Sequence, residues 1–304
     1  MIHLFGSITW TIILPIFLMI GVGVVMGRAF AIRQDTLNKL NIYVFVPALA
    51  FHKFLHSGLG IKEIGSILLF WMLWFAAMWI LSAAACALAR IPRGDRAVIE
   101  TGSMFPNVGN FGIPAQELAF GAVGASVQAV VLVIHNVLFF TLGTFIIGGG
   151  ISRLRAAVTA VVRLPIIYAM AAAAVLRLNP AWLPLPLDTA LGQLSQGLVP
   201  VALLTLGAQL AADKSSRFDA GIGLLVVLRL VLAPAVGYLI ALAMGMDHTL
   251  LSILVVSASL PAAVNTVVLA IEFHRRPNVA ASGVLWTTLL SAATVTATIA
   301  LTRG

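Results

Sequence analysis

Two short stretches combine proline and asparagine at the same spacing. In "SMFPNVGNFGIPAQ" (residues 103–116), Pro106 is followed by Asn107 and Asn110, and in "SLPAAVNTVV" (259–268), Pro261 is followed by Asn265. Proline removes a backbone donor and clashes with the preceding turn, so each stretch predicts a break in a helix. The half-helix after a break starts with free N–H groups and the positive end of the helix dipole. With asparagine amides beside them, such ends could bind a small carboxylate without Lys or Arg.

The elements that must position these stretches are predicted to be membrane spans. Hydrophobic residues make up 61% of the 304 residues and charged residues only 9%, whereas a soluble domain has about 25% charged residues. Runs without charge, such as 64–89 and 118–152, exceed the ~20 residues that a spanning helix needs. We therefore expect an all-α polytopic membrane protein with ten transmembrane helices. Their predicted ranges are 7–27, 35–55, 63–89, 96–121, 125–149, 158–177, 189–212, 220–245, 249–273 and 278–301.

The basic residues indicate an orientation. Thirteen of the 18 Lys and Arg residues belong to the odd-numbered loops and four to the even-numbered loops and the C-terminus, while Arg229 lies inside the eighth predicted helix. Lys and Arg concentrate in cytoplasmic loops. The sequence thus predicts a multi-pass protein of the cell (inner) membrane, in contact with lipid, with both termini extracytoplasmic. This bias explains the net charge of +8 without a nucleic-acid partner.

The proline motifs recur at long range. "LPIF" at residue 14 recurs as "LPII" at 164, "VPALAF" at 46 as "VPVALL" at 199, and "PNVGN" at 106 as "PAAVN" at 261. Glu117 and Glu272 keep the last offset. These motif pairs occur in the same order in both parts of the chain, and the separation within a pair grows slowly along it. They predict two related halves of five helices, residues 1–150 and 151–304. Because each half has an odd number of spans, the second is inverted, and discontinuous helices 4 and 9 are expected to cross near the bilayer centre.

The crossing is the predicted substrate site, because irregular backbone inside a membrane persists where it lines a polar cavity. The rest of the substrate is expected to contact the second and seventh helices. The candidate substrate-binding residues are Asn107, Asn110, Asn265, Pro106, Pro261, Val46, Ala48 and Val201. A structural alternative stays open, since proline kinks occur in many membrane helices without a ligand and asparagine can join neighbouring helices.

Three ionisable residues inside predicted spans are candidates for coupling or support. Glu100 could carry a coupling proton, or it could pair with Arg96 at the interface. Arg229 is costly in hydrocarbon unless it is paired or snorkels, and we expect it to pair with a carboxylate such as Glu100. His135 could titrate or be a hydrogen-bonded interior histidine. The sequence shows no metal-ligand cluster, phosphate loop or Ser-His-Asp spacing, so we expect no metal, no cofactor and no enzymatic activity.

These motifs resemble those of the auxin efflux carrier family, whose plant members are the PIN-FORMED proteins. "FPNVGNFGIP" (105–114) resembles the fourth-helix crossover of that family, and "VPALAFHKF" (46–54) its second helix. "LRLVLAPAV" (228–236) is similar to its eighth helix, and "SLPAAVNTVVLAIEFHRRPNVAASGV" (259–284) to its ninth and the start of its tenth. The large central loop of plant members is absent, which resembles the short bacterial members associated with malonate or malate.

The resemblance implies a homodimeric carrier of the elevator type with a sodium/proton antiporter-like fold. Helices 1, 2, 6 and 7 would form the scaffold, and helices 3–5 and 8–10 the moving transport domain. Asn107 matches the family's substrate-contacting asparagine, whereas Ile166 stands where the family has a second asparagine, which argues against the plant hormone as substrate. Asn265 replaces an apolar family residue.

The predicted function is secondary active transport of a small organic anion, an auxin-like compound or a mono- or dicarboxylate such as malonate or malate. One alternative is a sodium-coupled symporter of the bile-acid type, which dependence of uptake on sodium would reveal. A second is a membrane sensor without turnover.

Overall fold

The computed structural model describes residues 2–30, 33–148, 159, 161–212 and 217–303. Every regular element in these ranges is a helix or a helical turn. The α-helices are α1 (Ile2–Ile8), α2 (Leu14–Ala29), α3 (Gln34–Leu40), α4 (Val46–Leu55), α5 (Ile61–Leu88), α6 (Arg93–Met104), α7 (Ile113–Leu138), α8 (Thr144–Gly148), α10 (Pro165–Leu176), α11 (Leu185–Ala212), α12 (Ala220–Val227), α13 (Ala233–Ala243), α14 (His248–Ala258), α15 (Asn265–Glu272) and α16 (Pro277–Arg303). Wider π-helical turns are η1 (Thr9–Ile13), η2 (Asn41–Phe45), η3 (Val108–Gly112), η4 (Phe139–Gly143) and η7 (Leu228–Leu232), and η6 (Pro180–Trp182) is a short 3₁₀ turn.

Six helical stretches are long and apolar enough to cross a membrane, which confirms a multi-pass helical membrane protein. They are His3–Ala29, Ile61–Leu88, Val108–Gly148, Leu185–Ala212, Ala220–Ala243 and Pro277–Arg303. The third stretch bends at Gly121, whose φ is +63°, where the sequence predicted a boundary between helices 4 and 5. The count of ten spans stays a prediction. The boundary between residues 150 and 151 and the basic residues Arg153, Arg155 and Lys214 lie outside the described residues.

Four of the π-helical turns have a common cause. Each of η1, η2, η3 and η7 directly precedes a helix whose second residue is proline, namely Pro15, Pro47, Pro114 and Pro234. A proline ring clashes with the carbonyl four residues earlier and cannot donate to it. One extra residue in the preceding turn moves that carbonyl away, so these helices widen instead of breaking. The turn η4 is not followed by proline.

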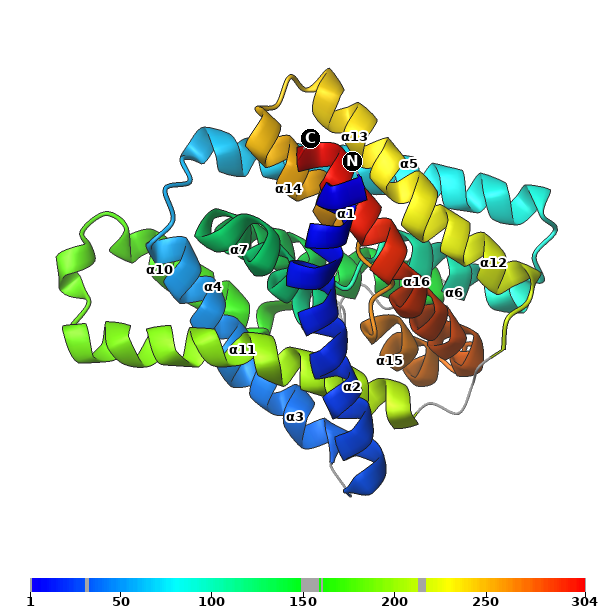
Figure 1. The fold of residues 1–304 in the computed structure, drawn as a ribbon, viewed down its shortest axis with the longest axis horizontal. Coiled ribbons are helices and arrows are strands. Elements are labelled where there is room, and N and C mark those ends of the chain that lie inside the picture. The colour runs from blue at the N-terminus through cyan, green and yellow to red at the C-terminus, as the bar shows by residue number, and fades with distance from the viewer. Residues whose placement is uncertain (1, 31–32, 149–158, 160, 213–216, 304) are drawn as a thin grey trace.

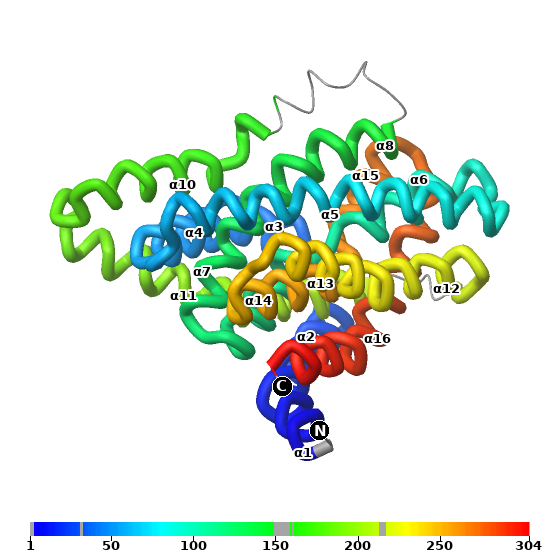
Figure 2. The backbone as a smooth tube through the Cα atoms, turned by 90° about the horizontal axis from the view of Figure 1, so that it is seen from above, coloured from blue at the N-terminus to red at the C-terminus, as the bar shows by residue number. Residues whose placement is uncertain are grey.

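The helices form two groups, and α7 packs against α4 on one side of the molecule. In Figure 1, α3, α4, α10 and α11 lie toward the left and α5, α6, α12, α13, α15 and α16 toward the right, while α2 runs down the middle and packs on α11. One large cluster of buried apolar side chains extends across both groups, and a smaller one, which includes Val98, Leu225 and Val279, joins α6, α12 and α16. Figure 2 shows the two chain ends beside each other, where α1 meets the end of α16.

Two glycines allow α2 and α11 to cross backbone to backbone. A Cβ on Gly207 would collide with the carbonyl oxygen of Ile20, and a Cβ on Gly23 with that of Leu204. Both helices run through the apolar core, so neither can move aside without opening a void. Close approach through small residues is a common way for membrane helices to associate.

We expect Gly207→Ala to destabilise the protein by about 3 kcal/mol, because the added methyl group meets rigid backbone. The melting temperature of the purified protein in detergent would measure this. Gly21→Ala is the matched control, since a Cβ at Gly21 has no neighbouring atom within 4 Å. Equal melting temperatures for the two variants would contradict the close crossing.

Candidate substrate site

The two predicted breaks meet and complete each other's backbone hydrogen bonds. Helix α6 ends at Met104 and α14 at Ala258, and each is followed by non-helical backbone. The Asn107 N–H donates to the Pro261 carbonyl at 2.7 Å, and the Ala263 N–H donates to the Phe105 carbonyl at 2.9 Å. Pro106 and Ala262 thereby form an antiparallel bridge. Such an exchange is what non-helical backbone buried within a membrane requires, because no water is available to bond it.

Arg229 bonds the carbonyl ends of both helices that lead into the breaks. Its Nη1 donates to the Ser103 carbonyl at 2.8 Å, its Nε to the Leu260 carbonyl at 2.9 Å, and its Nη2 to the Ala258 carbonyl. The side chain is fully buried, and its guanidinium lies 5.1 Å from the centre of the Trp74 ring. The negative ends of α6 and α14 thus compensate a buried cation.

The expected pairing of Arg229 with Glu100 is wrong. The Glu100 carboxylate instead accepts from Arg96 Nε at 2.6 Å, the alternative partner that its position allowed. A guanidinium has five donors in a planar fork, and three carbonyls at the two helix ends accept from its Nε, Nη1 and Nη2. The sequence could not show that these two ends would converge on one side chain.

A chain of polar side chains fixes the residues after the first break to α14. The Gln128 amide donates to the Val108 carbonyl at 2.9 Å, and its oxygen accepts from the Ser257 hydroxyl at 2.6 Å. The Gln116 amide donates to the same hydroxyl oxygen and to the Ile253 carbonyl. Gln116, Gln128 and Ser257 are fully buried. Sequence reasoning did not select these residues, since the local sequence does not show that they contact one another across 129 or more residues.

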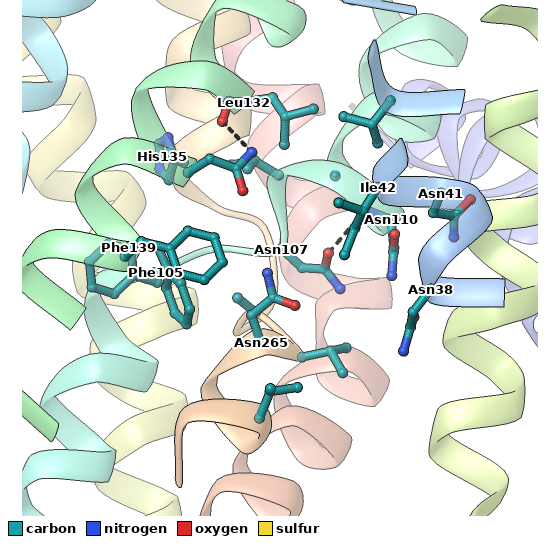
Figure 3. A pocket seen from close by; sticks show the side chains of 18 of the residues that line it. Asn38, Asn41, Ile42, Phe105, Asn107, Asn110, Leu132, His135, Phe139 and Asn265 are labelled. Atoms are coloured by element: carbon teal, nitrogen blue, oxygen red, sulfur yellow. Dashed lines mark hydrogen bonds between the residues drawn. The ribbon is translucent and has the colours of Figure 1, made fainter. Parts of the chain in front are cut away.

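A cavity of about 350 Å³ opens where the second half-helices begin. Asn107, Asn110 and Asn265 all line it, and Figure 3 shows them converging from the two breaks. The Asn107 side-chain oxygen accepts from the Asn110 N–H at 3.1 Å and so caps η3. The Asn107 amide nitrogen is buried and has no hydrogen-bond partner among the described residues. A free donor therefore lies at the N-terminal end of a half-helix.

Polar side chains of α3, η2 and α11 form the opposite wall, which the sequence reasoning missed. Asn38, Asn41 and Gln209 line the cavity there. The Gln209 amide donates to the Asn38 oxygen at 2.8 Å, and the Asn41 amide donates to the Thr205 hydroxyl at 3.3 Å. The side-chain oxygens of Asn41 and Gln209 have no partner in the part of the chain that the structure describes.

The other predicted substrate-binding residues divide into two sets. Pro106 and Val46 line the cavity, as does Ile166. Ala48 and Pro261 are buried and Val201 is partly buried, but these three are not among the lining residues. Pro261 instead contributes its carbonyl to the backbone exchange. Helix 2 therefore reaches the cavity through Val46, as expected, and helix 7 reaches it through Gln209 instead of Val201.

His135 lines the cavity, whereas the other two coupling candidates do not. Its ring packs edge-on against Trp71, with ring centres 4.2 Å apart, and its Nδ1 lies 2.9 Å from the Val131 carbonyl. This geometry matches the predicted alternative of a hydrogen-bonded interior histidine. Glu100 and Arg229 stay with their partners on the α6 and α14 side of the crossing.

No Lys or Arg is found among the described residues that line the cavity, although two carboxylates are. Asp35 is neutralised by Lys39, whose Nζ lies 2.7 Å from it, and Glu272 is at the exposed end of α15. A positive electrostatic potential inside the cavity, which would favour an anion, must therefore come from backbone N–H groups, helix N-termini and side-chain amides.

Replacing Arg229 with Met should cost about 3 kcal/mol or more, because buried carbonyls at two helix ends lose their donors. Arg229→Lys should rescue little, since one ammonium cannot reproduce the planar fork. Thermal unfolding in detergent would measure both, with Arg28→Lys at an exposed position as control. A melting temperature of Arg229→Met within error of the control would refute this role.

Comparison with known proteins fits this geometry. The family model described as "Membrane transport protein" matches residues 8–157 and 152–299. A protein of Rhizobium meliloti (strain 1021) described as "Putative malonate transporter" is 30% identical over 311 residues, which cover 96% of this chain and 95% of that protein. The chain belongs to the membrane transport protein family that includes the auxin efflux carriers, as the motifs at the two breaks indicated.

Proposed function

We propose that this protein is a secondary active transporter that carries a small carboxylate through the cavity at the helix crossing. The observation that carries the proposal is the buried Asn107 amide nitrogen, which has no partner among the described residues and lies at the start of η3. An unpaired buried donor costs about 1–3 kcal/mol, and a carboxylate oxygen would satisfy it. Asn110 and Asn265 line the same cavity and point toward it beside Asn107 (Figure 3).

A dicarboxylate fits the two polar walls better than a monocarboxylate. One carboxylate would accept from the asparagines at the crossing, and the other from amides of Asn38, Asn41 and Gln209 after their side chains turn. The cavity volume of about 350 Å³ is at the small end of the range for ligand pockets. The relative described as a malonate transporter is consistent with such a substrate.

The cavity is proposed to open to the cytoplasm. Asp35, Glu272 and Leu164 line it and lie at helix ends beside the basic, odd-numbered loops, which are cytoplasmic by the predicted orientation. On the opposite side, Lys53 of α4 bonds Glu117 of α7 at 2.7 Å. This pair would close the outer side in the inward-facing state of an elevator with the predicted scaffold and transport domain.

We expect Asn107→Ala and Asn265→Ala each to weaken substrate binding about tenfold or more, because each removes a donor to a desolvated carboxylate. Calorimetric titration with malonate, malate and succinate would measure the dissociation constants. Asn179→Ala is the control, since Asn179 caps η6 at a distant loop. Unchanged affinity in both crossing variants would remove the crossing as the binding site.

Uptake into proteoliposomes would test transport itself. Malonate, malate, succinate and indole-3-acetate would be compared while proton and sodium gradients are varied separately. We expect saturable uptake of a dicarboxylate that is lost in Asn107→Ala, and the gradient on which uptake depends identifies the coupling ion. Strict dependence on sodium would favour a sodium symporter, and binding without uptake under every gradient would favour a sensor.

Cross-linking would test the elevator movement. In a Cys86→Ala background, which removes the single cysteine, Lys53→Cys with Glu117→Cys would be joined by a short bis-methanethiosulfonate reagent, whose disulfide links a reductant cleaves. Cross-linking should abolish uptake and reduction should restore it, because α7 must slide along α4. The control pair replaces Asp95 and Arg276, which bond each other at 2.6 Å within the proposed transport domain. Full uptake with the Lys53–Glu117 link in place would argue against the movement.

A further inference from the structure

We propose that His52, His56 and Asp188 form a binding site for one transition-metal dication, for which Zn²⁺ is the best match. The three residues lie away from the substrate cavity, where the end of α4 meets the first turn of α11. One ligand atom from each residue lies within 4.8 Å of the others. The inference stands whether or not the transport proposal is correct.

The distances suit a small tetrahedral ion. His56 Nε2 lies 2.9 Å and His52 Nε2 lies 3.7 Å from Asp188 Oδ1. Ligands about 2.1 Å from zinc in a tetrahedron are ~3.4 Å apart, so the two measured distances lie on either side of that value. Small side-chain rotations would therefore bring all three atoms onto one ion.

The types of ligand and their spacing favour zinc. His52 lies in the last turn of α4 and His56 caps its end four residues later, with its N–H bonded to the His52 carbonyl, and helices use the same spacing to present two imidazoles to zinc. A carboxylate from a second helix completes a set of two nitrogens and one oxygen, which in zinc sites leaves a fourth position for water. Hard ions such as Mg²⁺ and Ca²⁺ prefer all-oxygen sets.

The surroundings leave room and access for the ion. Gly192 lies one turn after Asp188 on α11, and a Cβ there would be 3.0 Å from His52 Nε2. About half of the His56 side chain and a quarter of each of the other two are exposed, so an ion can enter from water. The neighbouring Lys53 ammonium forms an ion pair with Glu117. Its positive charge is therefore offset by a carboxylate outside the cluster.

A bound ion would join α4 to α11 at the end opposite to Asp35 and Glu272. By the predicted orientation, this end is extracytoplasmic, so the ion would be drawn from outside the cell. The competing explanation is a simple hydrogen bond between His56 and Asp188 that holds the same two helices. The two explanations differ in what Asp188→Asn does, because an amide oxygen keeps the hydrogen bond but is a poor metal ligand.

Zinc titration of the full-length, tag-free protein would test the site, after treatment with a chelator and its removal. Calorimetry with ZnCl₂ is expected to show one saturable site per chain. Affinity should fall about tenfold or more in His52→Ala, His56→Ala and Asp188→Asn. His248→Ala and His274→Ala are the matched controls, because both histidines lie outside the cluster and should leave binding unchanged.

Thermal unfolding separates the metal site from the hydrogen bond. Zn²⁺ should raise the melting temperature of the wild type and of both control variants, but not that of Asp188→Asn. Without metal, Asp188→Asn should melt close to the wild type. Absence of saturable Zn²⁺ binding, or binding that persists in all three ligand variants, would overturn the proposal.

Discussion

The buried Arg229 is the interaction on which the crossing depends. Helix ends cannot stop in the middle of a membrane unless their carbonyls are bonded, and one guanidinium bonds those of both α6 and α14. This cation compensates the negative ends on one side, while the positive ends of η3 and α15 border the cavity on the other side. The cavity can therefore favour an anion although no Lys or Arg lines it among the described residues.

Much of this arrangement could be predicted from local sequence, because it follows from proline chemistry and apolar runs. Pro106 and Pro261 mark both breaks, and the asparagines that follow them lie at the cavity. The helical ranges were predictable because runs without charged residues leave few alternatives to a membrane helix. The family was recognisable from the same two breaks, because the motifs around them are unusual within apolar helices.

The missed features depend on pairs that are distant in the chain. Asn41 lies at the start of η2 and lines the cavity, and it donates to Thr205, which is 164 residues away in the chain. The cluster of His52, His56 and Asp188 could not be predicted, because Asp188 is 132 residues from His56 in the chain. The sequence shows only the spacing of the two histidines. The carbonyl partners of Arg229 could not be predicted, because the local sequence does not show which helix ends converge.

The widened turns before Pro15, Pro47, Pro114 and Pro234 have a consequence for comparing relatives. Each extra residue rotates the following helix by about 100° relative to an unbroken α-helix. Side chains on either side of such a turn therefore follow two different helical phases. A relative that lacks one of these prolines can dispense with the extra residue, so a correct alignment would contain a one-residue gap inside an apolar span, where gaps are normally penalised.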